Sequence, residues 1–289
     1  MTRVRIMWFW GLIGLMILIT FQTGCTANNK VTEAIPKTVS DSNAGAASNT
    51  VGSDYPAVKE ETTTKSDNKD ILNVLKYKII CIDPGHGNPN HAIEYEPIAP
   101  SSNIMKPATA YGTTGITTKI PEYRLTMAVS LKLKDELLKT GAKVLMTRDN
   151  NNMDLGNIER AEIANNGSAD LAIRIHADGI DDYSVTGISV LVPGSRYIED
   201  AKLISNSRNA ANLVLESLIK RTHAKSRGVA ARDDLTGFNW SKVPVILIEM
   251  GFMTNPDEDK TLNTDHYQNE IVDGIVDGIS LYFTTLESQ

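Results

Sequence analysis

The stretch "PVILIEMGF" (Pro244–Phe252) decides the fold, because it is an apolar strand that ends on a carboxylate. Val245 to Ile248, together with Met250, suit the buried centre of a sheet. Burying an unpaired charge costs several kcal/mol or shifts the pKa until the group is neutral. Glu249 therefore either meets a cation or a donor, or lies at a site that uses its carboxylate.

The sequence on either side of this strand alternates short apolar runs with longer amphipathic ones. Four-residue apolar spacing, Pro121 at the start and Gly141 at the end predict a helix in "PEYRLTMAVSLKLKDELLKTG". Further helices are expected over 155–167, 198–221 and 267–283, and strands over 76–83, 142–148, 169–178, 186–194, 227–232 and 243–251. Strands separated by helices predict an α/β fold with a mostly parallel sheet covered on both faces.

Three of the predicted strands lead to polar side chains at their carboxyl ends. "IICIDPGHG" leads to His86, "LAIRIHAD" to His176 and "VILIEMG" to Glu249. These ends share one edge of an open α/β sheet, where ligands bind. A catalytic zinc usually takes three protein ligands. The third ligand could be Glu249 or another carboxylate, such as Glu122. Glu122 could equally be there only to stabilise its helix, since an acidic residue in the first turn interacts favourably with the helix dipole.

These motifs resemble those of one enzyme family. "IDPGHG", a glutamate opening the next helix, "IHAD" and "IEMGFMTNPDE" are similar, in order, to the zinc-dependent N-acetylmuramoyl-L-alanine amidases of bacterial cell walls. The similarity runs from about Tyr77 to the last helix. It implies a single α/β domain with a six-stranded sheet. It also implies one Zn²⁺ held by His86, Glu122 and His176, with Glu249 as the catalytic carboxylate.

The implied reaction is hydrolysis of the amide between N-acetylmuramic acid and L-alanine in peptidoglycan. Zinc would activate a water, and Glu249 would act as general base and then general acid. Two alternatives stay open on the sequence. One is another zinc hydrolase of the wall, a carboxypeptidase or a deacetylase, and the other is a lipoprotein that binds muropeptides without catalysis.

Several residues depart from the family pattern or add to it. The 35 residues between His86 and Glu122 are long for a connection and predict an ordered surface loop near the metal, forming a wall of the groove. Arg174 shares a strand face with His176 and needs a carboxylate partner, either Glu249 or Asp83. Asp83 is expected to orient an imidazole or to cap the turn, and Arg227 to contact substrate. We expect the remaining histidines at the surface: His91, His223 and His266.

The N-terminal segment predicts export. Two arginines, about sixteen mostly apolar residues and "TGC" indicate a signal peptide over 1–25, with Cys25 as a lipidated cysteine. An uncleaved helical anchor and plain secretion are the alternatives, and each places the enzyme outside the cytoplasmic membrane. Residues 26–70 are rich in Ser, Thr and Asn and predict a disordered tether. The catalytic domain would then span 71–289.

Composition limits the partners of this domain. The formal net charge is −6, and no basic stripe is present to neutralise phosphates, so nucleic acid is excluded as a partner. Only Cys25 and Cys81 are present, and we interpret Cys81 as a buried free thiol. We expect a monomer that acts on peptidoglycan.

Overall fold

The structure is a computed structural model that describes residues 74–88, 94–152 and 155–288. The chain divides into two units, Met1–Lys59 and Glu60–Gln289, and every described residue belongs to the second. The predicted leader 1–25 and tether 26–70 therefore lie outside the described residues. Within the described ranges, no helix has both the length and the apolar character needed to cross a bilayer.

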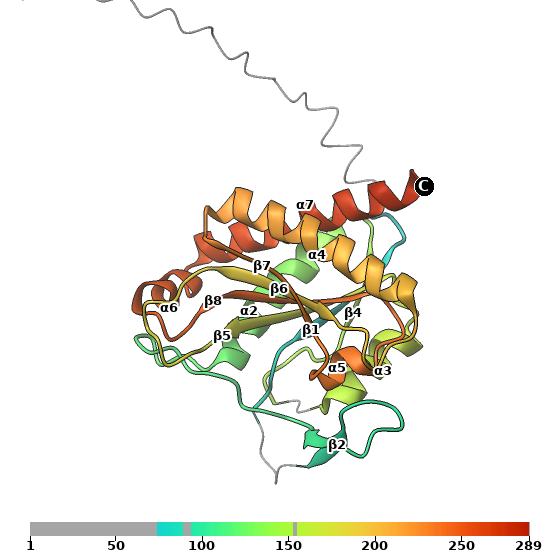
Figure 1. Cartoon of the computed structure of the whole chain (residues 1–289). Helices are drawn as coiled ribbons and strands as arrows, with labels where there is room; N and C mark the ends of the chain where they lie inside the picture. Colours follow the sequence, from blue (N-terminus) through green and yellow to red (C-terminus); the bar gives the residue numbers. More distant parts are fainter. Residues whose placement is uncertain (1–73, 89–93, 153–154, 289) are drawn as a thin grey trace, which may run out of the picture. The chain divides into compact units, whose positions relative to one another are not determined.

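Six strands form one mixed sheet in the order β4–β1–β5–β8–β6–β7 (Figure 1). Only β6 and β8 run antiparallel, and the other four neighbouring pairs are parallel. The predicted α/β fold with a mostly parallel, six-stranded sheet is confirmed. The strands are β1 (Ile79–Pro84), β4 (Lys143–Met146), β5 (Leu171–Asp178), β6 (Ile188–Pro193), β7 (Ser226–Arg232) and β8 (Val245–Phe252).

Helices cover both faces of this sheet, as Figure 1 shows. The larger core joins the sheet to α2, α4 and α7, and a smaller core on the other face joins it to α3 and α5. A sixth helix, α6, follows β8. The helices are α2 (Glu122–Lys139), α3 (Asn157–Asn166), α4 (Ala201–Thr222), α5 (Thr236–Asn239), α6 (Pro256–Leu262) and α7 (Asp265–Glu287).

Helix α2 starts and stops where its sequence predicts. Pro121 is the N-cap residue in an extended conformation, so Glu122 opens the first turn. Gly141, just past the C-cap, has a φ of +82°, a conformation that disfavours residues with a Cβ. The start matters for function, because it fixes the position of the Glu122 carboxylate.

Side chains alternate between the two faces of a strand, and this places Arg174, His176 and Glu249 on the face of the sheet that α3 and α5 cover. In β5, Ile173 and Ile175 pack into the larger core with α2, α4 and α7. Arg174 and His176 alternate with them and therefore project to the side of α3 and α5. His176 and Glu249 are register partners on adjacent parallel strands, so their side chains share this face.

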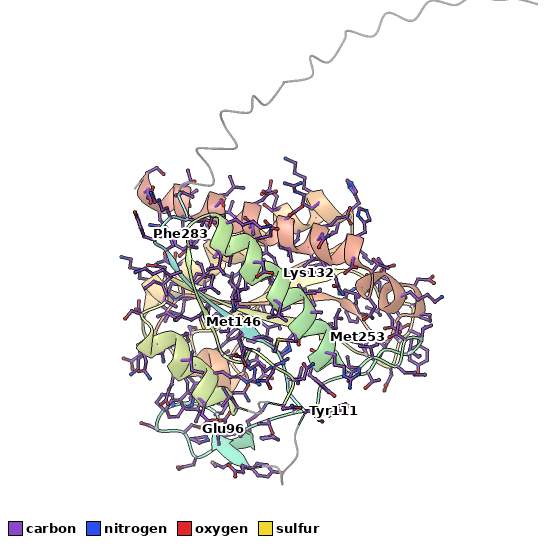
Figure 2. The ribbon with its side chains drawn as sticks, turned by 180° about the vertical axis from the view of Figure 1, so that it is seen from behind. Glu96, Tyr111, Lys132, Met146, Met253 and Phe283 are labelled. Carbon is purple, nitrogen blue, oxygen red and sulfur yellow. The ribbon has the colours of Figure 1, made fainter. Side chains whose placement is uncertain are left out.

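The long connection from β1 to α2 contains an element that the sequence did not predict. Strands β2 (Tyr95–Pro97) and β3 (Met105–Pro107) pair into a small antiparallel sheet. Glu96 in β2 accepts hydrogen bonds from the first backbone N–H groups of α3. Glu96 and Tyr111 lie at the end of the domain opposite Phe283 (Figure 2). This contact ties the connection to α3, so the described part of it is an ordered surface element, as predicted.

Candidate metal centre

His86 lies in the turn after β1 and has a φ of +61°, which is rare for a residue with a side chain. Its Nδ1 is 2.9 Å from the carbonyl oxygen of Ala110. Because a carbonyl only accepts hydrogen bonds, Nδ1 carries the proton and donates it. The lone pair of His86 is therefore on Nε2, the nitrogen that faces Glu122 and His176.

Glu122, the first residue of α2, is held by two backbone donors. Its Oε2 accepts from the N–H of Thr113 at 2.9 Å, and its Oε1 accepts from the N–H of Ala177 at 3.1 Å. Burial alone would raise the pKa of this carboxyl, but the adjacent imidazoles of His176 and His86 outweigh it and hold the pKa well below its usual range. Glu122 is therefore an ionised carboxylate.

His176 completes a compact triangle of donor atoms. Its Nδ1 is 3.2 Å from both His86 Nε2 and Glu122 Oε1, and those two atoms are 3.1 Å apart. Burial lowers the pKa of His176 to about 4, so the imidazole is neutral at physiological pH. The exposed fractions of the His86, Glu122 and His176 side chains are 19%, 4% and 12%, so the cluster is largely buried and His86 is its most exposed member.

The triangle fits a tetrahedral metal ion. Nitrogen and oxygen ligands at ~2.0–2.1 Å from a tetrahedral zinc lie ~3.3 Å apart, close to the separations here. Two imidazoles and one carboxylate also match the donor chemistry of catalytic zinc. The cluster is thus consistent with one metal ion at this edge of the sheet.

Glu249 lies beside this cluster but outside the triangle. Its Oε2 is buried and has no hydrogen-bond partner within the described residues. Burial raises the pKa of Glu249 well above its usual range, and the charges of Glu122 and Asp178 add to the shift. Arg174 and Arg232 oppose it only in part. The structure therefore brings together all four side chains that the sequence singled out.

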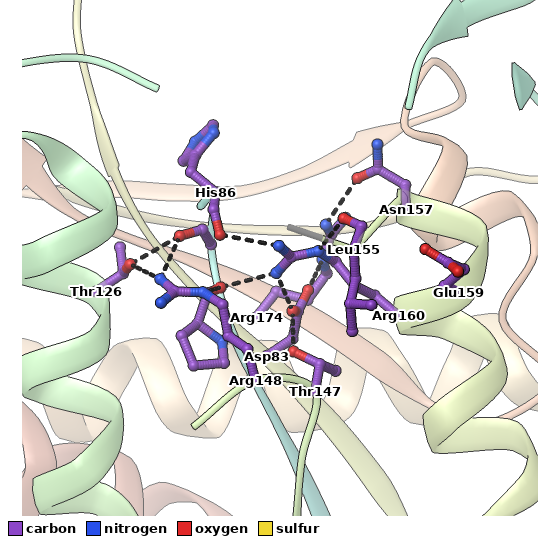
Figure 3. Close-up of polar contacts among 12 residues, drawn as sticks. Asp83, His86, Thr126, Thr147, Arg148, Leu155, Asn157, Glu159, Arg160 and Arg174 are labelled. Carbon is purple, nitrogen blue, oxygen red and sulfur yellow. Dashed lines mark hydrogen bonds and ion pairs between the residues drawn. The ribbon is translucent and has the colours of Figure 1, made fainter. Parts of the chain in front are cut away.

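Asp83 hydrogen-bonds to three side chains, one of which is the predicted partner Arg174. Its Oδ1 accepts from Thr147 at 2.6 Å and Arg160 at 2.7 Å, and its Oδ2 accepts from Arg174 at 2.7 Å (Figure 3). No hydrogen bond joins it to His86 or His176 within the described residues, whereas its partner Arg160 also holds the turn, so of the two predicted roles the contacts favour the turn. Burial alone would raise the pKa of Asp83, but Arg160 and Arg174 hold it well below its usual range. Of the two partners predicted for Arg174, the structure selects Asp83.

Two arginines missed by the sequence reasoning hold the turn that carries His86. Arg160 donates to the carbonyls of Pro84 and His86, each at 2.8 Å. Arg148 donates to the carbonyls of Pro84 and Gly85 (Figure 3), and also to that of Tyr123. Arg148 thereby connects the turn of one ligand to the first turn of α2, which carries another. Arg148 follows an apolar strand, and this position was a signal in the sequence for a role at the site. Arg160 lies inside a predicted helix, which gave no such signal.

Two glycines leave room for the ligands. A Cβ on Gly85 would lie 2.4 Å from the ring of His176. A Cβ on Gly112 would lie 2.6 Å from Glu122 Oε2 and 2.8 Å from the ring of His86. Gly112 also has a φ of +82°. Both positions therefore require glycine.

The remaining predicted residues lie away from the cluster. Arg227 is exposed, donates to the carbonyl of Thr186 at 3.3 Å and lies over the ring of Phe252. His223 and His266 are exposed, as predicted, and His91 is outside the described residues. Cys81 is a buried free thiol, as predicted, and burial with the nearby Asp83 charge raises its pKa to about 12.

Comparison with known proteins agrees with this geometry. The sequence profile of the N-acetylmuramoyl-L-alanine amidase family matches residues 80–281, which contain the whole cluster. The chain belongs to the N-acetylmuramoyl-L-alanine amidase family. The resemblance seen in the motifs is therefore confirmed, and with it the assignment as an amidase-family enzyme.

The amidase has relatives in several bacteria. It is 27% identical to the germination-specific N-acetylmuramoyl-L-alanine amidase of Bacillus subtilis, over 73% of this chain and 81% of the relative. It is 25% identical to an N-acetylmuramoyl-L-alanine amidase of Mycobacterium tuberculosis, over 72% of this chain and 87% of the relative. Its structure is similar to that of the amidase Ami1 from Mycobacterium smegmatis, with a TM-score of 0.66, 26% identity, and coverage of 73% of this chain and 99% of Ami1.

Proposed function

We propose that this amidase hydrolyses the amide between the lactoyl group of N-acetylmuramic acid and L-alanine in peptidoglycan, with one zinc ion. The observation that supports this most is that the His86–Glu122–His176 triangle and the buried Oε2 of Glu249 lie at one sheet edge, and that this oxygen has no partner among the described residues. Family membership supplies the bond that is cut and a site of action outside the cytoplasmic membrane.

Three atoms of the chain would hold the zinc: Nε2 of His86, Oε1 of Glu122 and Nδ1 of His176. When bound, zinc lowers the pKa of a water towards neutrality and polarises the substrate carbonyl. The chain prepares the ligands beforehand, because Ala110 fixes the tautomer of His86, and Thr113 and Ala177 fix the carboxylate of Glu122.

Glu249 moves the protons in this proposal. Its buried Oε2 accepts a proton as the oxygen of water adds to the carbonyl carbon. The same oxygen then donates that proton to the amide nitrogen as the carbon–nitrogen bond breaks. The products are the lactyl carboxylic acid and the free amino group of L-alanine. A divalent ion held by His86, Glu122 and His176 would favour the ionised form of Glu249, which is the basic form that the first transfer needs.

Product analysis on purified peptidoglycan tests the proposal. The zinc-loaded enzyme should generate new L-alanine amino termini, and a chelator should abolish them. Release of D-alanine or acetate would instead indicate a carboxypeptidase or a deacetylase. Retention of muropeptides without any product would indicate a binding protein.

Two substitutions separate the roles of the site residues. Glu249→Gln should keep the fold and stoichiometric zinc and lose at least about a hundredfold in rate, as expected for an essential acid–base group. His86→Ala should lose the metal itself, measured as zinc per chain after dialysis. Normal activity of the first variant, or wild-type zinc content of the second, would contradict the assignment.

We also propose a lipid anchor at Cys25, with 26–70 as the tether between membrane and enzyme. The support is the sequence of the leader, since both segments lie outside the described residues. Labelled fatty acid should be incorporated by the wild type and not by Cys25→Ser. Incorporation by both would exclude the anchor, and an intact N-terminus on the membrane-bound protein would favour an uncleaved helix.

Arg227 stays a candidate for contact with substrate, because it is exposed beside the end of β8. Arg227→Gln should raise KM with little change in kcat. A monomer stays the prediction for the oligomeric state, and light scattering of the purified protein tests it.

A further inference from the structure

A small cavity lies against the metal cluster. Its volume is about 60 Å³, and His86 and His176 form part of its wall. The remaining lining residues are Ala108, Thr109, Ala110, Leu155, Asn157, Arg160 and Arg174. Two guanidinium groups and an amide thus face this space, and none of its lining residues is acidic.

Arg174, one of the lining residues, has hydrogen-bonding capacity left over. The side chain is 9% exposed; its Nε donates to Asp83 at 2.7 Å, and its Nη2 donates to Asn157 Oδ1 at 3.0 Å. Its Nη1, which carries two N–H groups, makes no hydrogen bond within the described part of the chain. The guanidinium lies against Gly237, where a Cβ would come within 2.5 Å of Nη1.

Positive charge gathers on this wall. Arg160 and Arg174 both pair with the single carboxylate of Asp83. Arg174 also opposes the rise in the pKa of Glu96 and of Glu249 that burial causes, but neither of these carboxyls lines the cavity. With two guanidinium groups and no carboxylate on its wall, the cavity favours an anion.

The size of the cavity limits that anion. At ~30 Å³ per liquid water, 60 Å³ is the volume of about two water molecules, which is enough for a carboxylate group. The open donors of a guanidinium match the planar geometry of a carboxylate.

Resting on the function proposed above, we propose that this cavity is a carboxylate subsite of the substrate site, with Arg174 as its principal donor. Peptidoglycan offers two such groups near the scissile amide. One is the free α-carboxylate of the second stem residue, and the other is the lactyl carboxylate that hydrolysis releases. Arg174 is then a specificity-determining residue in the first case and a product-binding residue in the second.

The first arm of the test compares two muramoyl peptides that differ only in whether the α-carboxyl of the second residue is free or amidated. The full-length, zinc-loaded protein is used, and the readout is the ratio of the two kcat/KM values. A charge-assisted hydrogen bond predicts a preference of about ten- to a hundredfold for the free carboxylate. Arg174→Gln should bring the ratio close to one, and Arg174→Lys should keep part of it.

The second arm measures product inhibition by N-acetylmuramic acid against its lactyl amide. If the released carboxylate occupies the cavity, the acid inhibits the wild type more strongly, and Arg174→Gln removes the difference. Because each readout is a ratio within one protein, a partly misfolded variant does not imitate the result. Arg208→Gln, an exposed arginine on α4, is the matched control and should behave like the wild type in both arms.

The two proposals fail in different ways. If the wild type cleaves both peptides equally and is inhibited equally by acid and amide, the carboxylate subsite is refuted and the amidase function stands. The same refutation follows if a wild-type preference survives Arg174→Gln unchanged. If the wild type cleaves neither peptide while its zinc is bound, the proposed function itself is contradicted.

Discussion

Gly112→Ala should damage the metal centre without unfolding the protein. The residue has a φ of +82°, and an added Cβ would lie 2.6 Å from Glu122 Oε2 and 2.8 Å from the ring of His86. Two of the three proposed ligands must therefore shift. Gly228 provides the matched control, because it has a φ of +83° and no atom within 4 Å of an added Cβ.

Both substitutions strain the backbone, but only one of them disturbs the metal ligands. Placing alanine in the left-handed region costs about 1–2 kcal/mol in each variant. Only Gly112→Ala also disturbs the ligands, since the moving carboxylate strains the hydrogen bond from Thr113 to Glu122 Oε2. Disturbing groups that orient metal ligands typically costs ten- to a hundredfold in affinity. That range corresponds to about 1.4–2.7 kcal/mol of metal binding.

Zinc competition with a chromophoric chelator measures the affinity, and urea unfolding of the metal-free protein measures the stability. We expect both variants to lose about 1–2 kcal/mol of unfolding free energy, and only Gly112→Ala to bind zinc more weakly. Equal zinc affinities in the two variants would refute the ligand geometry described above.

Three further outcomes are expected. Arg160→Met removes charged hydrogen bonds to Asp83 and to the carbonyls of Pro84 and His86. The unfolding free energy of the metal-free protein should therefore fall by about 3 kcal/mol, and zinc affinity should fall tenfold or more. Unchanged zinc affinity would show that this arginine does not position His86. In metal-free protein, Glu249→Gln should be more stable than the wild type at pH 7 and equal to it at pH 4. The reason is that a raised carboxyl pKa makes wild-type stability fall as pH rises above the unfolded value, and a gain that persists at pH 4 would argue against this cause. Burial raises the pKa of Cys81 to about 12 in the folded protein. Between pH 7 and pH 10, the stability of the wild type should therefore fall by about 2 kcal/mol more than that of Cys81→Ala, as measured by urea unfolding. Parallel pH profiles of the two proteins would show that the thiol is not buried as described.

The sequence by itself predicted the strands and helices of an α/β fold and the polar residues at the carboxyl ends of three strands. Apolar runs of strand length and the amphipathic runs between them are local patterns, so they can be recognised without knowing any tertiary contact. His86, His176 and Glu249 could be placed at one edge because the carboxyl ends of parallel strands meet there. Glu122 needed the family resemblance, because a glutamate in a first helical turn has an ordinary explanation as well.

Only the tertiary structure decided how these residues are held and what surrounds them. The contacts of Asp83 with Arg160 and Arg174 span 77 and 91 residues of sequence, and no local pattern encodes such partners. The β2–β3 sheet and the space left by Gly112 were missed for the same reason, since they depend on packing between distant segments. Local periodicity follows from the backbone, whereas the pairing of charges and the size of a cavity depend on side chains that meet only after folding.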